Sequence, residues 1–344
     1  MYWLVLWGAA LFAAMAPSIF ASPVAGGLRH TAVNENFYGV EIAGDRTWIV
    51  GYYGTILHSA DRGATWTIQT SPARSALYRT RFLGRDRGWI VGSFGTLLRT
   101  DDGGGHWRVQ ATGTDEHLFD LTWLDEHKGV AVGSRGTILR TDDGGRTWID
   151  NSLPEDLTLN SIVFVDATRG WIAAEFGVIF HSNDGGATWR KQPSPVEVAI
   201  ASGESQNLFA VHFDQTEAGW AFGLDGVILK NQGRSGWQII RRKQNSAESF
   251  EANHLFAAAQ FGERLWAVGE RGTLLQAAPG GREWRRVALD IPRVSLNAIA
   301  FSKDGFGLAV GNRGMVLRTQ DGGNTWSRLT IRLQSSDNDR NRFP

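Results

Sequence analysis

The feature that most constrains the fold is the stretch from Gly136 to Trp148, because versions of it recur along nearly the whole sequence. It reads Gly-Thr-Ile-Leu-Arg-Thr-Asp-Asp-Gly-Gly-Arg-Thr-Trp, an apolar β-branched run followed by an Asp/Gly turn and a Thr-Trp pair. An apolar run that is followed by such a turn and by a Thr-Trp pair predicts two antiparallel strands joined by a tight turn. Since the pattern repeats, the chain is predicted to be a repeat protein.

The turn portion, Ser/Thr-x-Asp-x-Gly-x-Thr-Trp, is called the Asp box below. Copies that keep the aspartate are centred on Asp61, Asp102, Asp143, Asp184 and Asp321. Two worn copies, which end at Trp237 and Trp284, lack it. A carboxylate beside a Gly-rich turn can accept the backbone N–H groups of that turn. We therefore interpret the five aspartates as structural, in preference to metal binding or catalysis.

The repeat predicts the fold class. Its box tryptophans stand at positions 66, 107, 148, 189, 237, 284 and 326, a spacing typical of propeller blades. Each unit holds four short apolar runs, for example Leu77–Phe82, Gly88–Gly92, Gly95–Arg99 and Trp107–Gln110. We predict an all-β protein, a seven-bladed β-propeller of four-stranded antiparallel blades, over residues 37–333. Stacked blades bury each other's apolar faces, so the tryptophans of the second run are predicted to be core.

The ends of the chain differ from the repeats. Residues 1–22 are almost wholly apolar and carry no charge, which predicts either a signal peptide or an N-terminal membrane anchor. Residues 23–36 are interpreted as a linker, and the polar residues 334–344 as a disordered tail. The expected location is outside the cytoplasm, in a periplasm or a thylakoid lumen, with or without attachment to the membrane through the N-terminal segment.

The amino-acid composition argues against several kinds of partner and site. Lys+Arg and Asp+Glu are equal at 35 each, which argues against nucleic-acid binding. The chain has no cysteine, so disulfides, zinc–thiolate sites and a lipid-modified N-terminal cysteine are excluded. The eight histidines show no metal-ligand spacing. We therefore predict no metal and no cofactor, and we expect a monomer.

The candidate binding site lies at the Gly-x-x-Gly turn between the second and third runs of each unit. Antiparallel strands reverse at alternate ends, so this turn and the long connections between units lie at the end of the blade opposite the Asp box. The residues before the second glycine are Tyr53, Phe94, Arg135, Phe176, Asp225, Arg271 and Arg313. Arginine and aromatic residues are favoured anchors at protein interfaces. Arg241, Arg242 and Lys243 would add basic charge, and the alternative is that all these residues merely keep hairpin tips soluble.

The joined pattern Gly-Trp-x-Val-Gly-x-x-Gly-Thr-Ile-Leu-Arg-Thr and Asp-Gly-Gly-x-Thr-Trp resembles the Ycf48/HCF136 family of photosystem II assembly factors, over about residues 37–332. The box alone also occurs in sialidases and sortilin-like receptors, whereas the joined pattern is more particular. The resemblance implies a seven-bladed propeller in the thylakoid lumen or on its membrane. It also implies a non-enzymatic chaperone that binds newly made D1 protein. The lipobox cysteine common in cyanobacterial members is absent here, and the family has relatives in bacteria without photosynthesis.

The predicted function is therefore that of a non-enzymatic assembly or stability factor, which binds a membrane-protein client of a photosynthetic or other envelope complex. The alternatives are a propeller glycoside hydrolase of the sialidase kind and a carbohydrate-binding protein. Hydrolysis would need two carboxylates that face each other across the sugar. Glu175, Asp225 and Glu270 stand at neighbouring hairpin tips, but the sequence shows no evident partner for any of them.

Overall fold

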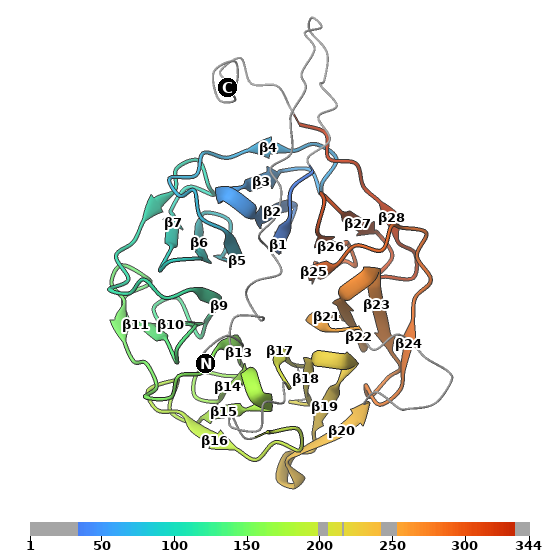
Figure 1. The fold of residues 1–344 in the computed structure, drawn as a ribbon. Helices are drawn as coiled ribbons and strands as arrows, with labels where there is room; N and C mark the ends of the chain where they lie inside the picture. Colours follow the sequence, from blue (N-terminus) through green and yellow to red (C-terminus); the bar gives the residue numbers. More distant parts are fainter. Residues whose placement is uncertain (1–33, 199–205, 215–216, 242–252, 334–344) are drawn as a thin grey trace, which may run out of the picture.

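Residues 34–198, 206–214, 217–241 and 253–333 are described in this computed structural model. Seven four-stranded antiparallel sheets stand like blades around one axis (Figure 1), which confirms the predicted all-β, seven-bladed propeller. The predicted leader (1–22), most of the linker and the tail (334–344) lie outside the described residues, as do Arg242 and Lys243. The helical turns within the described ranges are 3-10 turns such as Tyr52–Gly54 and Glu270–Gly272, and no helix there has the length and apolar character needed to cross a bilayer.

In every blade the chain runs from the strand nearest the axis to the strand at the rim (Figure 1). The inner strands are β1 (Phe37–Ala43), β5 (Leu77–Leu83), β9 (Leu118–Trp123), β13 (Leu159–Phe164), β17 (Leu208–Phe213), β21 (Leu255–Phe261) and β25 (Leu296–Phe301). The second strands are β2 (Arg46–Gly51), β6 (Arg87–Gly92), β10 (Gly129–Gly133), β14 (Gly170–Ala174), β18 (Gly219–Gly223), β22 (Arg264–Gly269) and β26 (Gly307–Gly311).

The third strands are β3 (Ile56–Ser59), β7 (Leu97–Thr100), β11 (Ile138–Thr141), β15 (Ile179–Ser182), β19 (Ile228–Asn231), β23 (Thr273–Ala277) and β27 (Val316–Thr319). The outer strands are β4 (Thr67–Ile68), β8 (Arg108–Val109), β12 (Ile149–Asp150), β16 (Arg190–Gln192), β20 (Trp237–Arg241), β24 (Trp284–Arg286) and β28 (Ser327–Arg328). Short outer strands limit the length of unpaired sheet edge that each blade exposes.

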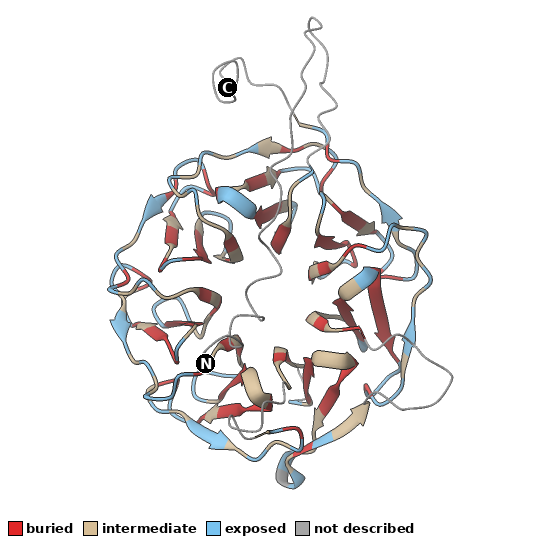
Figure 2. Cartoon of the chain, viewed as in Figure 1, coloured by how far each residue is buried: buried red, intermediate tan, exposed pale blue. Residues whose placement is uncertain are grey.

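The core lies between the blades. Figure 2 shows the second strands almost entirely buried, while the outer strands are largely exposed. The tryptophans of the second strands are core residues, as predicted: Trp48, Trp89, Trp171, Trp220 and Trp266. The stacking of Trp48 on Phe82 of the next blade, with ring centroids 3.7 Å apart, shows how one ring fills the wedge between two sheets.

Each intact Asp box is a hydrogen-bonded turn, as predicted. In the third blade the hydroxyl of Thr141 accepts the N–H of Gly145 at 3.0 Å. Oδ1 of Asp143 accepts the N–H groups of Arg146 and Thr147, both at 2.9 Å, and Oδ2 accepts the hydroxyl of Thr147 at 2.6 Å. The carboxylate therefore satisfies donors that the tight turn would otherwise leave unpaired.

The second glycine of the box packs against the preceding blade. Gly145 has φ +71°, and a Cβ at this position would lie 2.4 Å from Nε1 of the buried Trp89. Gly323 stands in the same relation to Trp266, at 2.3 Å from its ring. The box needs this glycine both for its left-handed backbone and for the close approach of two blades.

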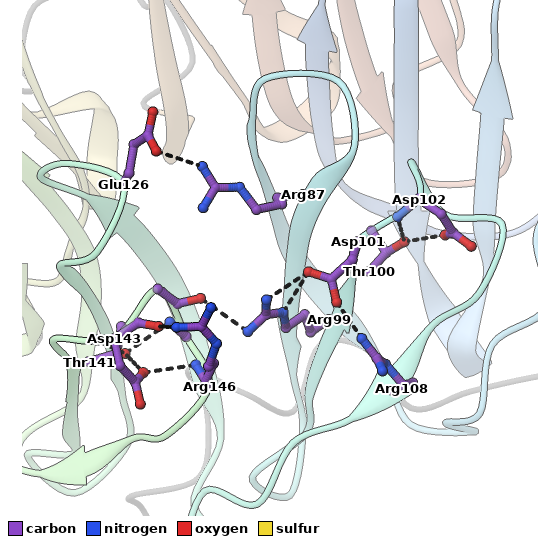
Figure 3. A network of polar contacts seen from close by, with 12 residues as sticks. Arg87, Arg99, Thr100, Asp101, Asp102, Arg108, Glu126, Thr141, Asp143 and Arg146 are labelled. Atoms are coloured by element: carbon purple, nitrogen blue, oxygen red, sulfur yellow. Dashed lines mark hydrogen bonds and ion pairs between the residues drawn. The ribbon is translucent and has the colours of Figure 1, made fainter.

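Polar contacts reinforce the same end of the ring between the second and third blades (Figure 3). Arg99 pairs with Asp101 at 2.7 Å and donates to the carbonyl oxygen of Gly144 at 3.2 Å. Arg87 pairs with Glu126 across the blade boundary at 3.2 Å. Ion pairs near the surface contribute about 0 to 1 kcal/mol each, so the interdigitated tryptophans outweigh them.

Replacing Asp143 by alanine is expected to lower the free energy of unfolding by about 1 to 2 kcal/mol, because several turn donors lose their acceptor. Chemical denaturation followed by tryptophan fluorescence measures this. Asp142→Ala is the matched control, since Asp142 only forms an ion pair with Arg140. Equal stability of both variants would contradict the turn-forming role of Asp143.

The box carboxylates and three partly buried histidines have shifted pKa values, which affect stability in acid. Hydrogen bonds from the hydroxyl and backbone N–H of Thr325 lower the pKa of Asp321 from 3.8 to about 2. For Asp184, burial raises the pKa, but hydrogen bonds from Thr188 outweigh it and bring the pKa to about 2. Burial lowers the pKa of His58, His181 and His212 below 6.5.

All these groups have folded-state pKa values below their unfolded values, so each contributes stability that is lost as the pH falls. The histidine contribution is expected to fade first, below about pH 6.5, and the aspartate contribution between about pH 4 and pH 2. Thermal midpoints measured across this range should therefore decline in two stages. A midpoint that stays flat down to about pH 3 would contradict the assignment.

One buried carboxylate ties three blades together near the axis. Asp120 on β9 is only 1% exposed. Its Oδ1 accepts Nε of Arg79 on β5 at 2.9 Å, and its Oδ2 accepts the hydroxyl of Ser161 and the N–H of Ile162 on β13, both at 3.1 Å. A buried charge with this set of partners holds the inner strands in register.

In the described residues every blade consists of four consecutive strands, so the first and last blades exchange no strand when the ring closes. Instead, the N–H of Trp66 donates to the carbonyl oxygen of Arg332 at 2.9 Å, and Ile331 joins the apolar cluster between these blades. Arg62, which replaces the first glycine of its box, has φ +57° and pairs with Asp304 of the last blade at 2.6 Å. The sequence did not indicate these closing contacts.

Candidate functional site

The hairpin tips between second and third strands share one backbone conformation. In the first blade the N–H of Thr55 donates to the carbonyl oxygen of Tyr52 at 3.1 Å, and the two central residues, Tyr53 and Gly54, have φ +52° and +75°. Positive φ at both central positions is the signature of a type I′ turn, which suits the twist of a two-residue hairpin. All seven tips repeat it.

The residues in the first left-handed position are unusual for this turn. Type I′ turns favour Asn, Asp or Gly there, because larger side chains are strained at positive φ. The structure places Tyr53, Phe94, Arg135, Phe176, Asp225, Arg271 and Arg313 at this position, with φ between 51° and 57°. Six of these seven are arginine or aromatic. Turn formation does not account for these residues, and such strained positions cluster at binding sites.

Contacts to the next blade hold the tips in place. The N–H of Gly136 donates to the carbonyl oxygen of Leu157 at 2.7 Å, and equivalent bonds occur at other tips. The N–H of Phe94 donates to Nδ1 of His117 at 3.1 Å, and the N–H of Asp225 donates to Nδ1 of His254 at the same distance. The tips and the connections between blades thus form one surface, which we call the tip face.

A ring of bulged residues lies beside the tips and was missed by the sequence analysis. Each inner strand has a β-bulge after its first residue, and the inserted residues are Tyr38, Tyr78, Phe119, Asn160, Phe209, Phe256 and Asn297. Tyr78 lies between Tyr38 and Phe119, with ring centroids 5.7 and 5.3 Å away. Bulges re-aim side chains next to functional sites. In five of the seven units this residue is aromatic, and that recurrence was the signal available in the sequence.

The predicted tip residues all lie on the tip face but differ in exposure. Tyr53 is 59% exposed, Phe94 is 71% exposed, and the side chain of Arg135 is 69% exposed. Arg271 and Arg313 are also exposed, whereas Phe176 and Asp225 are partly buried. Arg241 lies at the end of β20 with its guanidinium near Gly226, and burial lowers its pKa. Its guanidinium is therefore less available for contact with a partner than the sequence predicted.

Charge on the tip face is divided into two sectors. Between β8 and the end of the connection after β16, seven carboxylates accompany two cations, Arg135 and Lys191; we call this the acidic sector, with Asp115, Glu116, Asp150, Glu155, Asp156, Glu175 and Glu197. Arg135 lies 3.6 Å from Glu116 and 3.9 Å from Asp156. Its charge is therefore partly compensated, in contrast to the simple basic anchor expected from the sequence.

The opposite side of the tip face is basic. Between the tip of the sixth blade and the connection after the first, six arginines accompany three carboxylates; we call this the basic sector, with Arg74, Arg271, Arg286, Arg293, Arg313 and Arg328. A hollow of about 380 Å³ lies there, lined by Arg271, Arg286 and Arg293 and by the apolar side chains of Leu289 and Ile291. Equal numbers of charges in the whole chain conceal this division.

Two of the three tip carboxylates considered for hydrolysis, Glu175 and Glu270, are engaged in local contacts. Oε1 of Glu175 accepts the N–H of Thr158 at 2.8 Å, and Glu270 lies 3.9 Å from Nε2 of His254. In the described ranges, no group of three or more potential metal-ligating side chains is found. The arrangement suits recognition of a surface, with polar and aromatic groups spread over several blades.

Comparison with known proteins indicates which family this chain resembles. A family model described as photosynthesis system II assembly factor YCF48 matches residues 104–195. A solved structure described as YCF48 bound to D1 peptide shares 19% identity and a TM-score of 0.67, covering 83% of this chain and 93% of its own. This chain is a Ycf48-like seven-bladed propeller.

Other propellers resemble this Ycf48-like chain in fold. YCF48 from Cyanidioschyzon merolae has 18% identity and a TM-score of 0.65, covering 85% of this chain and 97% of its own. A GH74 xyloglucanase from Xanthomonas campestris has 13% identity and a TM-score of 0.70, covering 87% of this chain and 55% of its own. No curated protein matches the sequence.

Proposed function

We propose that this Ycf48-like propeller is a non-enzymatic assembly or stability factor that binds a membrane-protein client on its tip face. The observation that carries the proposal is the set of strained tips, where arginine and aromatic side chains replace the residues that a type I′ turn prefers. Arginine, tyrosine and phenylalanine are the side chains enriched at protein interfaces. The family match to an assembly factor supports the same role.

We infer the chemical class of the client from a solved structure that this chain resembles. The YCF48 structure described with a D1 peptide indicates that this fold can hold a segment of a membrane protein. The proposed client here is of that class, either D1 itself or a subunit of another envelope complex. A glycoside hydrolase is less well supported, because the likeness to the xyloglucanase at 13% identity concerns the fold alone. Glu175 is also occupied by a backbone N–H.

The combined substitution of Arg135, Arg271 and Arg313 by alanine tests this function. We expect binding to an immobilised D1 peptide, or to detergent-solubilised membranes of the source organism, to weaken about tenfold or more. The arginine at 135 should contribute least, since Glu116 and Asp156 already compensate its charge. Surface plasmon resonance with the peptide measures the change.

Arg108, Arg190 and Arg285 provide the matched control, because they are exposed arginines at one equivalent position of three outer strands, on the side of the Asp box. Their combined replacement by alanine removes the same charge and should leave binding unchanged. Equal loss in both variants would indicate a nonspecific charge effect. Undiminished binding in the tip variant would show that the arginines of the tip face are not part of the client-binding site.

A further inference from the structure

The chain enters the propeller inside the basic sector. The described chain begins at Asn34, and the next two residues are fixed against the tip of the last blade. The carbonyl oxygen of Glu35 accepts the N–H of Gly314 at 2.6 Å, and Oδ1 of Asn36 accepts the N–H of Arg313 at 3.1 Å. Residues that precede Asn34 therefore join the protein on the tip face, between the last blade and the first.

The side chains around this entry point are those of a lipid-facing surface. Tyr52 and Tyr53 on the first blade are 47% and 59% exposed. Asn36 links their tip to that of Arg313, because its carbonyl oxygen accepts the N–H of Tyr52 at 2.9 Å and its side chain accepts the N–H of Arg313. Tyrosine prefers the headgroup level of a bilayer, and arginine near a membrane is attracted to anionic lipid. The acidic sector lies on the other side of the same face and would be repelled by such a surface.

We propose that the basic sector docks on an anionic lipid surface, with Tyr52 and Tyr53 at the headgroup level. The sequence of residues 1–22 has no charge and the length of a membrane span, and it is joined to this sector through residues 23–36. Attachment at this point would bring the sector against the bilayer. The docking goes beyond client binding, because it sets the orientation of the propeller and leaves the acidic sector at the outer edge of the contact.

Footprinting on lipid vesicles tests the docking. The full chain is reconstituted into vesicles of phosphatidylcholine alone and of phosphatidylcholine with phosphatidylglycerol, and exposed side chains are oxidised by hydroxyl radicals and read by mass spectrometry. We expect Tyr52 and Tyr53 to be oxidised several-fold less on the anionic vesicles. Val109 and Ile149, which are 62% and 59% exposed on outer strands, should be oxidised equally on both.

Charge reversal provides the control. Replacing Arg271, Arg293 and Arg313 together by glutamate should abolish the difference between the two vesicles, while the same change at Arg108, Arg190 and Arg285 should preserve it. Equal oxidation of Tyr52 and Tyr53 on both vesicles would overturn the docking, as would protection that survives charge reversal of the sector. If Tyr52 and Tyr53 were protected only after a D1 peptide is added, the basic sector would be a client-binding surface and not a lipid-binding one. Since the vesicles contain no client, a negative result leaves the proposed function intact.

Discussion

Replacing Asp120 by alanine is expected to lower the free energy of unfolding by about 3 to 5 kcal/mol, the range found when one partner of a buried charge pair is removed. The substitution leaves Arg79 without its buried acceptor and leaves Ser161 and Ile162 without theirs. Because the carboxylate joins the second, third and fourth blades, the loss should also reduce cooperativity. Equilibrium unfolding in urea, followed by circular dichroism, measures both effects.

Asp101 offers the control for this experiment. Its carboxylate pairs with Arg99 at the exposed box end, so Asp101→Ala should cost at most about 1 kcal/mol. A small effect of Asp120→Ala, no larger than that of Asp101→Ala, would contradict the view that the inner strands depend on this buried tie.

Replacing Gly145 by alanine is expected to lower the free energy of unfolding by about 2 to 5 kcal/mol, the sum of left-handed strain and overpacking. The new Cβ would lie 2.4 Å from Nε1 of Trp89, which is fully buried and cannot withdraw without moving a blade. Differential scanning calorimetry measures the shift in the thermal midpoint.

Gly113 separates the two causes. It has φ +72°, almost the same as Gly145, but an added Cβ would meet nothing within 4 Å. Gly113→Ala therefore reports the backbone strain alone, about 1 to 2 kcal/mol. If the two variants were equally stable, close approach of the box to Trp89 would not be a constraint on the fold.

The repeat made the fold predictable from the sequence. A period with an Asp box at one end and a Gly-x-x-Gly turn at the other specifies four strands and the direction of each. Apolar residues on both faces of the second strand require neighbouring blades on both sides. These are local patterns, so strand order, the role of Asp143 and the buried position of Trp89 could be stated before the structure was known.

The site was less predictable because it depends on contacts between blades. The tips were identified by position, but their left-handed backbone and their anchoring to the next blade were not. The ion pairs of Arg135 join residues from separate segments of the chain, and Asp120 joins three inner strands. Patterns within one repeat do not specify which side chains meet across a blade boundary.

Photo-crosslinking to the client tests the central claim most directly. Benzoylphenylalanine is placed singly at Tyr53, Phe94, Val109 or Ile149, positions that are all well exposed in the described structure. Each full-length variant is irradiated with a D1 peptide, and the adducts are sequenced by mass spectrometry. Binding on the tip face predicts adducts from positions 53 and 94 and none from positions 109 and 149. Adducts from positions 109 and 149, with none from 53 and 94, would contradict it and place the client on the outer strands.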